Sequence, residues 1–266
     1  MKNTQIISVI NQKGGVGKTT TVINLATALS FYKKKILVID LDPQGNATTG
    51  FGLLNNNESK TIYDVLNGNC SFEDTIQDTK VDNLKLVSSN VDLSGLEVET
   101  ASENRRAFLL KDKIENFINN PKNNFSYIFI DCPPSLSLLT VMSLVVAKSL
   151  IVPLQAEFFA LEGLSQLMKT IDRVKIKLNP ELEIRGVLLT MFDKRNKLSA
   201  EVDTEARKFF KEKVYQTIIP RNVRLSEAPS HGVPILIYDK LCAGSKSYSS
   251  FAEEFLKQEN IMESAA

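Results

Sequence analysis

Cysteine and histidine are scarce in this chain, which narrows the chemistry open to it. Its 266 residues include three cysteines, Cys70, Cys132 and Cys242, and the single histidine His231. The cysteines are far apart and show no CxxC spacing, and one histidine alone cannot form a metal site. An odd and sparse set of cysteines, in a chain without a signal peptide, indicates reduced thiols in the cytosol.

Long apolar runs and a strong net charge are also missing. No apolar run approaches the roughly 18 residues that span a bilayer. The polar residues 1–5 lead directly into a strand, so no targeting segment is expected. Lys and Arg total 32 against 31 Asp and Glu, which gives a net charge of +1 and a pI near 7.6. Contact with nucleic acid or anionic lipid must therefore come from a local patch.

Apolar runs and helical periodicity alternate along the chain, without an internal repeat or a low-complexity linker. Strands that are apolar throughout belong to parallel sheets covered on both faces, and their alternation with helices is typical of βαβ units. The expected strands are 6–10, 36–39, 84–87, 127–130, 150–153 and 184–190, and the expected helices lie near 19–31, 104–117, 161–177, 200–213 and 248–258. We predict a single α/β domain over residues 1–266, with a doubly wound, mostly parallel sheet and helices on both faces.

A glycine-rich loop with the sequence QKGGVGKTT occupies residues 12–20, between the first expected strand and helix. Glycines let successive backbone N–H groups point into one concavity that binds phosphate oxygens, and the following helix N-terminus adds to the attraction. Lys18 can reach the β- and γ-phosphates of ATP, and the Thr19 hydroxyl can ligate Mg²⁺. The predicted nucleotide-binding residues of the loop are Lys13, Gly14, Gly15, Val16, Gly17, Lys18, Thr19 and Thr20.

This loop departs from the usual GxxxxGK[ST] pattern of phosphate loops, because Gln12 stands where a glycine is expected and Lys13 follows it. The form KGGVGKT resembles the deviant Walker A motif of the ParA/MinD ATPases. Other segments resemble the ParA/Soj branch of that family, so the resemblance extends from residue 5 to about residue 240. These segments are NQK at 11–13, LDPQGN at 41–46, DCPPS at 131–135 and IPRNVRLSEAPS at 219–230. The resemblance implies a P-loop NTPase fold and ATP with Mg²⁺ as cofactors.

Carboxylates stand at the ends of two apolar strands, the place where ligands bind in doubly wound sheets. By resemblance, Asp42 is the catalytic switch-region residue that positions the attacking water, although an aspartate before Pro43 is also a common turn residue. Asp131 resembles the Walker B aspartate, which holds Mg²⁺ through water. Asp40 also ends its strand, and we expect it to play a supporting role by hydrogen-bonding the phosphate loop.

Lys13 and Lys18 complete the predicted catalytic set with Asp42. The resemblance implies that Lys13 reaches across a dimer interface to the nucleotide of the partner subunit. There it would add positive charge as the γ-phosphate leaves, like an arginine finger supplied in trans. Hydrolysis would then require a homodimer with two ATP molecules between its subunits; the alternative is an exposed loop lysine without this role.

The last third of the chain carries the residues predicted to contact the base and DNA. Pro220 and Asn222 match the adenine-contacting loop of the family. Arg195 and Arg224 match positions where Soj-like proteins carry DNA-contacting arginines, although a single arginine is as often a solvated surface charge. They form one patch only if the fold brings their segments together. Non-specific DNA binding would improve when an ATP-bound dimer doubles that patch.

The predicted function is that of an ATP-hydrolysing switch for chromosome or plasmid partitioning, cytoplasmic and associated with the nucleoid. A ParB-like centromere-binding protein would stimulate its slow turnover. The alternatives are a MinD-like regulator, a metabolic P-loop synthetase and an iron–sulfur carrier. Residues 251–266 carry four glutamates and one lysine, and such an acidic tail is unsuited to anionic lipid, so membrane binding is not expected.

Overall fold

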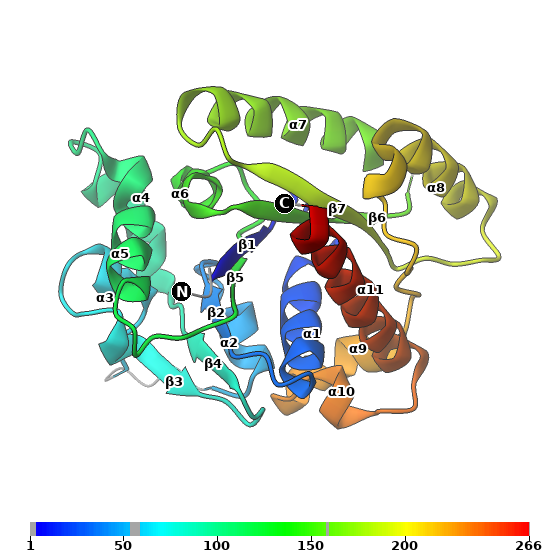
Figure 1. The fold of residues 1–266 in the computed structure, drawn as a ribbon, viewed down its shortest axis with the longest axis horizontal. Coiled ribbons are helices and arrows are strands. Elements are labelled where there is room, and N and C mark those ends of the chain that lie inside the picture. The colour runs from blue at the N-terminus through cyan, green and yellow to red at the C-terminus, as the bar shows by residue number, and fades with distance from the viewer. Residues whose placement is uncertain (1–3, 54–58, 158–159, 266) are drawn as a thin grey trace.

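The computed structural model describes residues 4–53, 59–157 and 160–265, and its centre is a seven-stranded sheet (Figure 1). The strands are β1 (Gln5–Val9), β2 (Ile36–Asp40), β3 (Ile76–Asp78), β4 (Leu84–Val87), β5 (Tyr127–Asp131), β6 (Ser149–Gln155) and β7 (Glu183–Thr190). Their order across the sheet is β3-β4-β2-β5-β1-β6-β7. All neighbouring strands are parallel except β3 and β4, so the predicted mostly parallel sheet is confirmed.

Helices cover both faces of this sheet (Figure 1). The α-helices are α1 (Lys18–Phe31), α2 (Asn46–Gly50), α3 (Ile62–Leu66), α4 (Leu96–Glu99), α5 (Leu109–Ile118), α6 (Leu138–Val146), α7 (Ala160–Lys177), α8 (Lys197–Phe210), α9 (Val223–Glu227), α10 (Ile235–Tyr238) and α11 (Ala243–Ala265). Two separate cores result, because successive strand side chains point to opposite faces. In β5, for example, Ile128 and Ile130 join the core under α5, α6 and α7, whereas Tyr127 and Phe129 join the core under α1 and α11.

Helix α1 is buried on nearly all sides, which explains why polar residues within it bond to its own backbone. The Thr27 hydroxyl donates to the Ile23 carbonyl, and the Ser30 hydroxyl donates to the Thr27 carbonyl. Asn24 also accepts a hydrogen bond from the backbone N–H of Ile235, and so ties α1 to α10. The helix that follows the phosphate loop is therefore held firmly by the sheet, α10 and α11.

Several elements differ from the sequence-based expectation. The helix expected over 104–117 begins only at Leu109, after a 3₁₀ turn at Arg106–Phe108. The helix expected near 248–258 is longer, because its buried stripe of Tyr248, Phe251 and Phe255 continues a helix that already begins at Ala243. The sequence pattern does not predict helix α6 or the short antiparallel strand β3. Helix α6 is apolar on almost every side, so it shows no helical periodicity.

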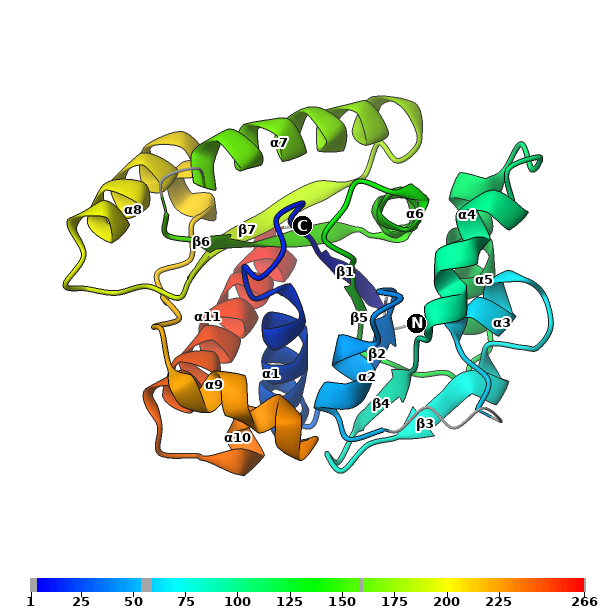
Figure 2. The same ribbon diagram turned by 180° about the vertical axis from the view of Figure 1, so that it is seen from behind.

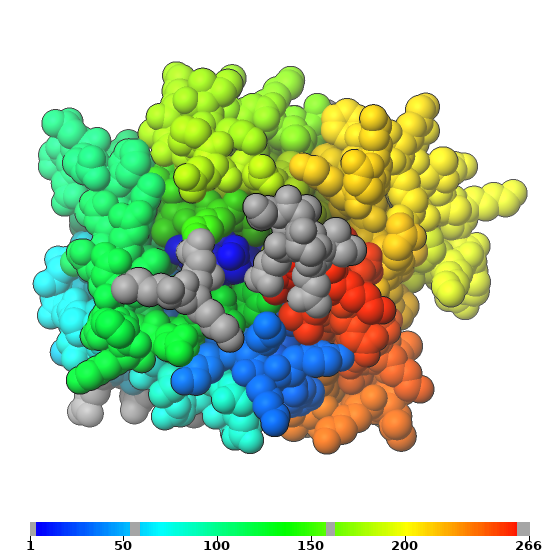
Figure 3. Space-filling view, viewed as in Figure 1, coloured from blue at the N-terminus to red at the C-terminus, as the bar shows by residue number. Residues whose placement is uncertain are grey.

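The two edges of the sheet carry different loops. Figure 2 views the carboxyl edge, where the phosphate loop (dark blue) lies near α2 and the segment of α9 (orange). Figures 1 and 3 view the amino edge, where the connections that enter the strands lie. Within the described residues, no helix combines the length and apolar character needed to cross a membrane.

Candidate nucleotide-binding site

The phosphate loop is anchored at its entrance by Asn11. The Asn11 side chain donates from Nδ2 to the Pro153 carbonyl on β6, at 2.8 Å, and accepts from the backbone N–H of Lys13 at 3.0 Å. One buried side chain thus joins the loop to the neighbouring strand and sets the direction in which the chain leaves β1. Asn11 belongs to the NQK motif of the sequence, but its anchoring role depends on the strand order.

The body of the loop depends on left-handed backbone at two glycines. Gly15 and Gly17 have φ values of 75° and 91°, which other residues adopt only with strain. The Thr190 hydroxyl, at the end of β7, donates to the Val16 carbonyl at 2.8 Å and fastens the loop from the other side. No sequence signal points to Thr190, since only the crossover that places β7 beside β6 brings it here.

Lys18 is a buried lysine at the start of α1, with 6% of its surface exposed. Its ammonium donates to the Lys13 carbonyl at 3.1 Å, so the side chain folds back across the loop. Burial lowers the pKa of Lys18, and the nearby carboxylates of Asp131 and Asp42 partly offset this. A buried ammonium among backbone N–H groups is suited to a ligand that brings several negative charges.

Asp131 lies beside Asp40 in the sheet, because the two residues are register partners at the ends of β5 and β2. Both are fully buried, and neither carboxylate oxygen of Asp131 accepts a hydrogen bond from a described residue. Burial and the Asp40 carboxylate raise the pKa of Asp131 well above its usual range, with the Thr19 hydroxyl acting in the opposite direction. A buried carboxyl without a partner, close to a hydroxyl, fits a hydrated Mg²⁺ ion.

Asp40 makes the hydrogen bonds that Asp131 lacks. Its Oδ2 accepts from both the backbone N–H and the hydroxyl of Thr48, at 2.8 and 2.7 Å, and its Oδ1 accepts from the N–H of Asp42 at 3.2 Å. The Thr48 hydroxyl in turn accepts from the N–H of Ser89, which follows β4. Asp40 therefore supports helix α2 and the Asp42 turn. Among the described residues, the expected hydrogen bonds between Asp40 and the phosphate loop are not formed, because its carboxylate bonds to Thr48 and Asp42 instead.

The ionisation of Asp40 should make the folded protein less stable as the pH rises. Burial raises the pKa of Asp40 to about 6 from the ordinary 3.8, so the folded state holds a proton that the unfolded state has already lost. Stability from this group is thus present below pH 3.8 and is lost as the pH rises toward about 6. One pKa unit corresponds to about 1.4 kcal/mol, so the loss is at most about 3 kcal/mol.

Comparison with Asp40→Asn removes the contributions of carboxyl groups on which the Asp40 charge has no effect. The unfolding free energy of the wild type minus that of Asp40→Asn should fall as the pH rises from 3.8 to about 6, measured in denaturant without nucleotide or Mg²⁺. Asp131 changes this difference in the same direction. The Asp40 carboxylate raises the pKa of Asp131 in the wild type, and Asp40→Asn removes that charge, so the wild type loses more stability than the variant as the pH rises. A difference that stays constant or grows with pH would show that Asp40 is ionised in the fold throughout.

Asp42 lines a cleft of about 490 Å³ on the carboxyl edge. Its side chain is 5% exposed, and its Oδ1 accepts from the backbone N–H of Gln44 at 3.0 Å. The cleft runs from the phosphate loop past Asp42 to the segment after α9. The walls beyond the loop include Asn46, Thr49, Pro134, Met191, Ser226, Pro229 and Ser230. Its size suits a nucleotide.

Two glycines allow the segment after α2 and the segment after α9 to meet. Gly52, just after α2, and Gly232, just after the 3₁₀ turn Ala228–His231, both have positive φ. A Cβ atom on Gly52 would lie 2.5 Å from the Gly232 carbonyl oxygen, which is closer than atoms can approach. The α2 segment and the segment after α9 are therefore in direct backbone contact.

Lys13 does not line this cleft. Its ammonium forms an ion pair with Glu157, which follows β6, and its side chain is 45% exposed. The backbone carbonyl of Lys13 still receives the Lys18 ammonium. Lys13 is thus at the mouth of the loop and directed away from the nucleotide cleft of its own chain, so its predicted role in trans stays a prediction.

The predicted base-contacting residues lie beside the cleft. Pro220 pairs with Phe192 in an isolated bridge, and the Asn222 Oδ1 atom is buried without a hydrogen-bond partner among the described residues. The wall itself includes Met191, which has an unusual φ of 49°, and Ser226. Contact of Pro220 and Asn222 with adenine stays a prediction.

Arg195 and Arg224 extend from two segments that the fold places side by side. The N–H of Phe192 donates to the Ile219 carbonyl, and the N–H of Arg221 donates to the Phe192 carbonyl, each at 3.1 Å. The segments that lead to the two arginines are therefore neighbours at Phe192 and Arg221, and a patch shared by the two side chains stays a prediction. Whether that patch binds DNA stays a prediction.

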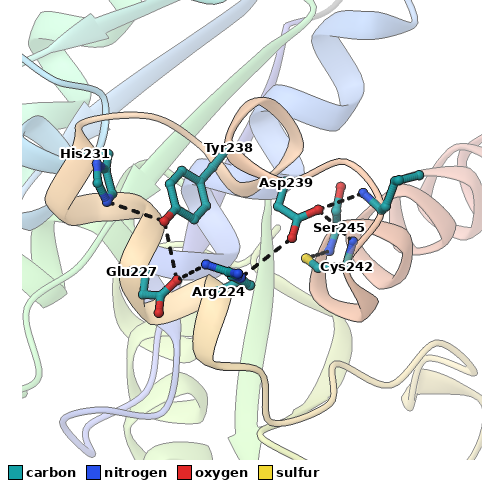
Figure 4. Close-up of polar contacts among 8 residues, drawn as sticks. Arg224, Glu227, His231, Tyr238, Asp239, Cys242 and Ser245 are labelled. Atoms are coloured by element: carbon teal, nitrogen blue, oxygen red, sulfur yellow. Dashed lines mark hydrogen bonds and ion pairs between the residues drawn. The ribbon is translucent and has the colours of Figure 1, made fainter.

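Each of these arginines is paired with carboxylates. Arg195 binds Asp193 through two nitrogens, at 3.0 and 2.9 Å, and lowers the pKa of that carboxyl to about 2. Figure 4 shows Arg224 between Glu227 at 2.9 Å and Asp239 at 3.8 Å. Tyr238 donates to Glu227 from the other side and stacks on His231, the single histidine, so a polar network joins α9 to α10 (Figure 4).

The remaining sequence candidates for metal chemistry lie apart from one another. Cys70 and Cys242 are partly exposed, whereas Cys132 is buried with its Sγ 3.0 Å from the Ser143 hydroxyl. Burial raises the pKa of Cys132 to about 12, so this thiol stays protonated near neutral pH. In the described part of the chain, no group of three or more His, Cys, Asp or Glu side chains is arranged to hold a metal ion.

Comparison with known proteins agrees with this geometry. Residues 4–184 match a family described as an AAA domain. The chain is 49% identical to the chromosome partitioning protein ParA of Caulobacter vibrioides (strain NA1000 / CB15N), over 98% of this chain and 97% of that protein. It is 47% identical to the sporulation initiation inhibitor protein Soj of Bacillus subtilis (strain 168), over 94% of this chain and 97% of that protein.

A similar solved structure contains a nucleotide analogue. It is that of cobyrinic acid a,c-diamide synthase from Mycobacterium smegmatis with bound ATP analog and magnesium, with a TM-score of 0.83 and 32% identity, over 96% of this chain and 95% of that chain. The sheet and its helices are thus those of P-loop nucleotide-binding proteins.

Proposed function

The chain belongs to the ParA/Soj family of chromosome-partitioning ATPases, and from this premise we propose that it is an ATP-driven dimerisation switch that carries DNA. ATP with Mg²⁺ occupies the cleft on the carboxyl edge. Two ATP-bound subunits form a sandwich dimer that binds DNA without sequence specificity, and hydrolysis releases it. The observation that carries this proposal is the loop itself: Lys18 is buried beneath it, and Lys13 stands at its mouth, outside the cleft.

Residues of this chain account for nucleotide binding and orientation. The N–H groups of the phosphate loop and the Lys18 ammonium bind the phosphates, since Lys18 can exchange the Lys13 carbonyl for a phosphate oxygen. Thr19 and Asp131 would hold Mg²⁺, which neutralises charge on the β- and γ-phosphates when it is bound. The Asp131 carboxylate lacks a hydrogen-bond partner among the described residues, which supports this assignment.

Hydrolysis requires an oriented water and positive charge on the departing phosphoryl group. Asp42 orients the water from its place at the cleft, held there by the Asp40–Thr48 hydrogen bonds. Lys13 supplies the charge to the nucleotide of the second subunit, for which it must leave Glu157. A monomer would then hydrolyse ATP slowly, because its own Lys13 is directed away from its own cleft.

DNA binding is assigned to the surface around Arg195 and Arg224. Both arginines are more than half exposed and stand on adjoining segments, and a dimer would carry two such surfaces. The segment of Arg224 continues into Ser226 and Ser230 of the cleft wall. This continuity supports a dependence of DNA binding on nucleotide state. A ParB-like partner would accelerate hydrolysis, and the protein would be found in the cytoplasm on the nucleoid.

Replacement of Lys13 tests the dimer mechanism. Binding of a non-specific DNA duplex, measured by fluorescence anisotropy with ADP or with ATP, should require ATP and weaken as salt rises. Lys13→Ala should lower the ATP-dependent DNA affinity at least about tenfold, a loss of about 1.4 kcal/mol, and should leave the protein monomeric with ATP. Lys246→Ala, which removes an exposed lysine of α11, is the matched control and should bind as the wild type does.

Other outcomes separate the competing functions. DNA binding absent under every nucleotide condition would contradict the proposal. Sedimentation with anionic vesicles in the presence of ATP would then favour a MinD-like regulator. Rapid turnover without DNA or protein partner would instead favour a metabolic synthetase on the same fold.

A further inference from the structure

A second cavity opens on the amino edge of the sheet, at the end of the molecule opposite the phosphate loop. Three neighbouring strands meet there: Lys35 directly precedes β2, Lys85 lies in β4, and Lys122 lies in the loop before β5. Figure 3 shows this face, on which the blue segment after α1, the cyan segment before β4 and the green segment before β5 all lie. We call this the lysine cavity.

The lysine cavity has a volume of about 510 Å³ and three kinds of wall. The lysines supply ammonium groups, and three asparagines, Asn83, Asn123 and Asn124, supply amides. Phe125 contributes an aromatic ring, together with the side chain of Ile76. A cavity of this size holds a small organic ligand, and this combination of walls suits one that is anionic at one end and flat at the other.

Positive charge in the cavity exceeds negative charge. Lys35 and Lys122 form no ion pair with any residue that the structure describes, and Lys85 pairs at 3.0 Å with Asp78, whose side chain is 84% exposed. Among the described residues of the wall, only Glu73 carries a carboxylate, and it accepts a hydrogen bond from the Asn123 amide at 2.8 Å. The cavity is therefore attractive to an anion, although the whole chain is close to neutral.

The walls are held in place by the backbone of the sheet, so the cavity exists before a ligand binds. The Lys35 carbonyl accepts from the N–H of Ser126 at 2.7 Å, and the Asn83 carbonyl accepts from the N–H of Ile36 at 2.8 Å. Asn83 has a left-handed φ of 62°, and Asn123 is also bonded to the Phe117 carbonyl. A preformed site loses little conformational entropy on binding.

We infer that the lysine cavity binds a nucleotide, either free or as a unit of single-stranded nucleic acid. The ammonium groups of Lys35 and Lys122 bind its phosphate, the Phe125 ring stacks on the base, and the side-chain amides of Asn83 and Asn124 contact the base edge. Duplex DNA is excluded, because its bases are already stacked and paired. This inference is independent of the proposed function, since the cavity shares no wall residue with the ATP cleft.

Calorimetric titration of dTMP tests the inference on protein whose ATP cleft is saturated with MgADP. We expect dTMP to bind the wild type and its affinity to fall at least about tenfold in Lys35→Ala/Lys122→Ala, as the loss of two charged contacts to a phosphate implies. The matched control is Lys175→Ala/Lys177→Ala, which removes the same charge from the exposed end of α7 and should bind as the wild type does. Unchanged MgADP binding by both double variants shows that they are folded.

Two further binding measurements identify which kind of ligand the cavity takes. Phe125→Leu should weaken dTMP and leave inorganic phosphate unaffected, because phosphate has no ring to stack. Oligothymidylate that binds more tightly than dTMP identifies single-stranded nucleic acid as the ligand, and equal affinity identifies a free nucleotide. Absence of dTMP and oligothymidylate binding, or an equal loss in the control double variant, would overturn the inference.

Discussion

Asp42→Ala is expected to lower ATP turnover at least about 100-fold, because removal of a group that positions the reacting water costs about 10²- to 10⁴-fold in rate. The affinity for MgATP should stay within about threefold of that of the wild type. Asp42 lines the cleft and is almost buried, and its hydrogen bond is made within its own turn, to the Gln44 N–H, and not to the phosphate loop. Turnover is measured as phosphate release, and binding with a fluorescent ATP analogue.

Asp42 also closes a turn, so its two roles must be separated. Asp42→Asn retains an oxygen that can accept the Gln44 N–H, and it lacks the charge. If the carboxylate positions water, the asparagine variant is as inactive as the alanine variant; if the turn alone matters, it restores turnover. Asp74→Ala is the control, because Asp74 also accepts a backbone N–H of its own turn, that of Ser71, and does not line the cleft.

Lys18→Met is expected to weaken MgATP binding at least about 100-fold, which corresponds to about 2.7 kcal/mol. The ammonium is the cation that lies buried beneath the loop, and methionine keeps most of its volume without its charge. Charge-assisted hydrogen bonds to phosphate in a buried site are stronger than neutral ones. Equilibrium dialysis or calorimetry with the ATP analogue measures the loss.

The fold of this variant should survive. Without nucleotide, the Lys18 charge is desolvated and bonded to one carbonyl, so its removal costs little stability. A melting temperature close to that of the wild type, together with weak binding, supports a phosphate-binding role. Normal nucleotide affinity in Lys18→Met would contradict it, and Lys246→Ala again serves as the exposed-lysine control.

The architecture of the cleft links these residues to the surface that carries Arg224. Asp40 holds α2 through Thr48, and α2 meets the segment after α9 through Gly52 and Gly232. One hydrogen-bonded helix and one backbone contact thus form a continuous path from Asp40 to the segment after α9. The network of Glu227, Tyr238 and Asp239 around Arg224 lies at the far end of that path (Figure 4).

Much of the fold was predictable from local pattern alone. Fully apolar strands such as Ile36–Asp40 and Tyr127–Asp131 indicate a parallel sheet, because only burial on both faces tolerates them. Helices with one apolar face, such as α7 and α8, show their period because their other face is polar and solvated. Helix α6 is buried on most sides and lacks a polar face, and β3 has only three residues, so neither carries a readable period.

The nucleotide site likewise contains residues that the sequence predicts and contacts that only the fold reveals. The sequence by itself determined the phosphate loop, because its glycines and lysine are contiguous in the chain and need only local conformation. It predicted Asp42 and Asp131 from their places just after apolar strands and from the family resemblance. Tertiary structure alone decided that Thr190 fastens the loop, that Asp40 supports α2, and that Lys13 pairs with Glu157. Thr190 and Glu157 reach the loop only because β6 and β7 follow β1 in the sheet. The order of strands in a sheet depends on long-range packing that no local pattern encodes.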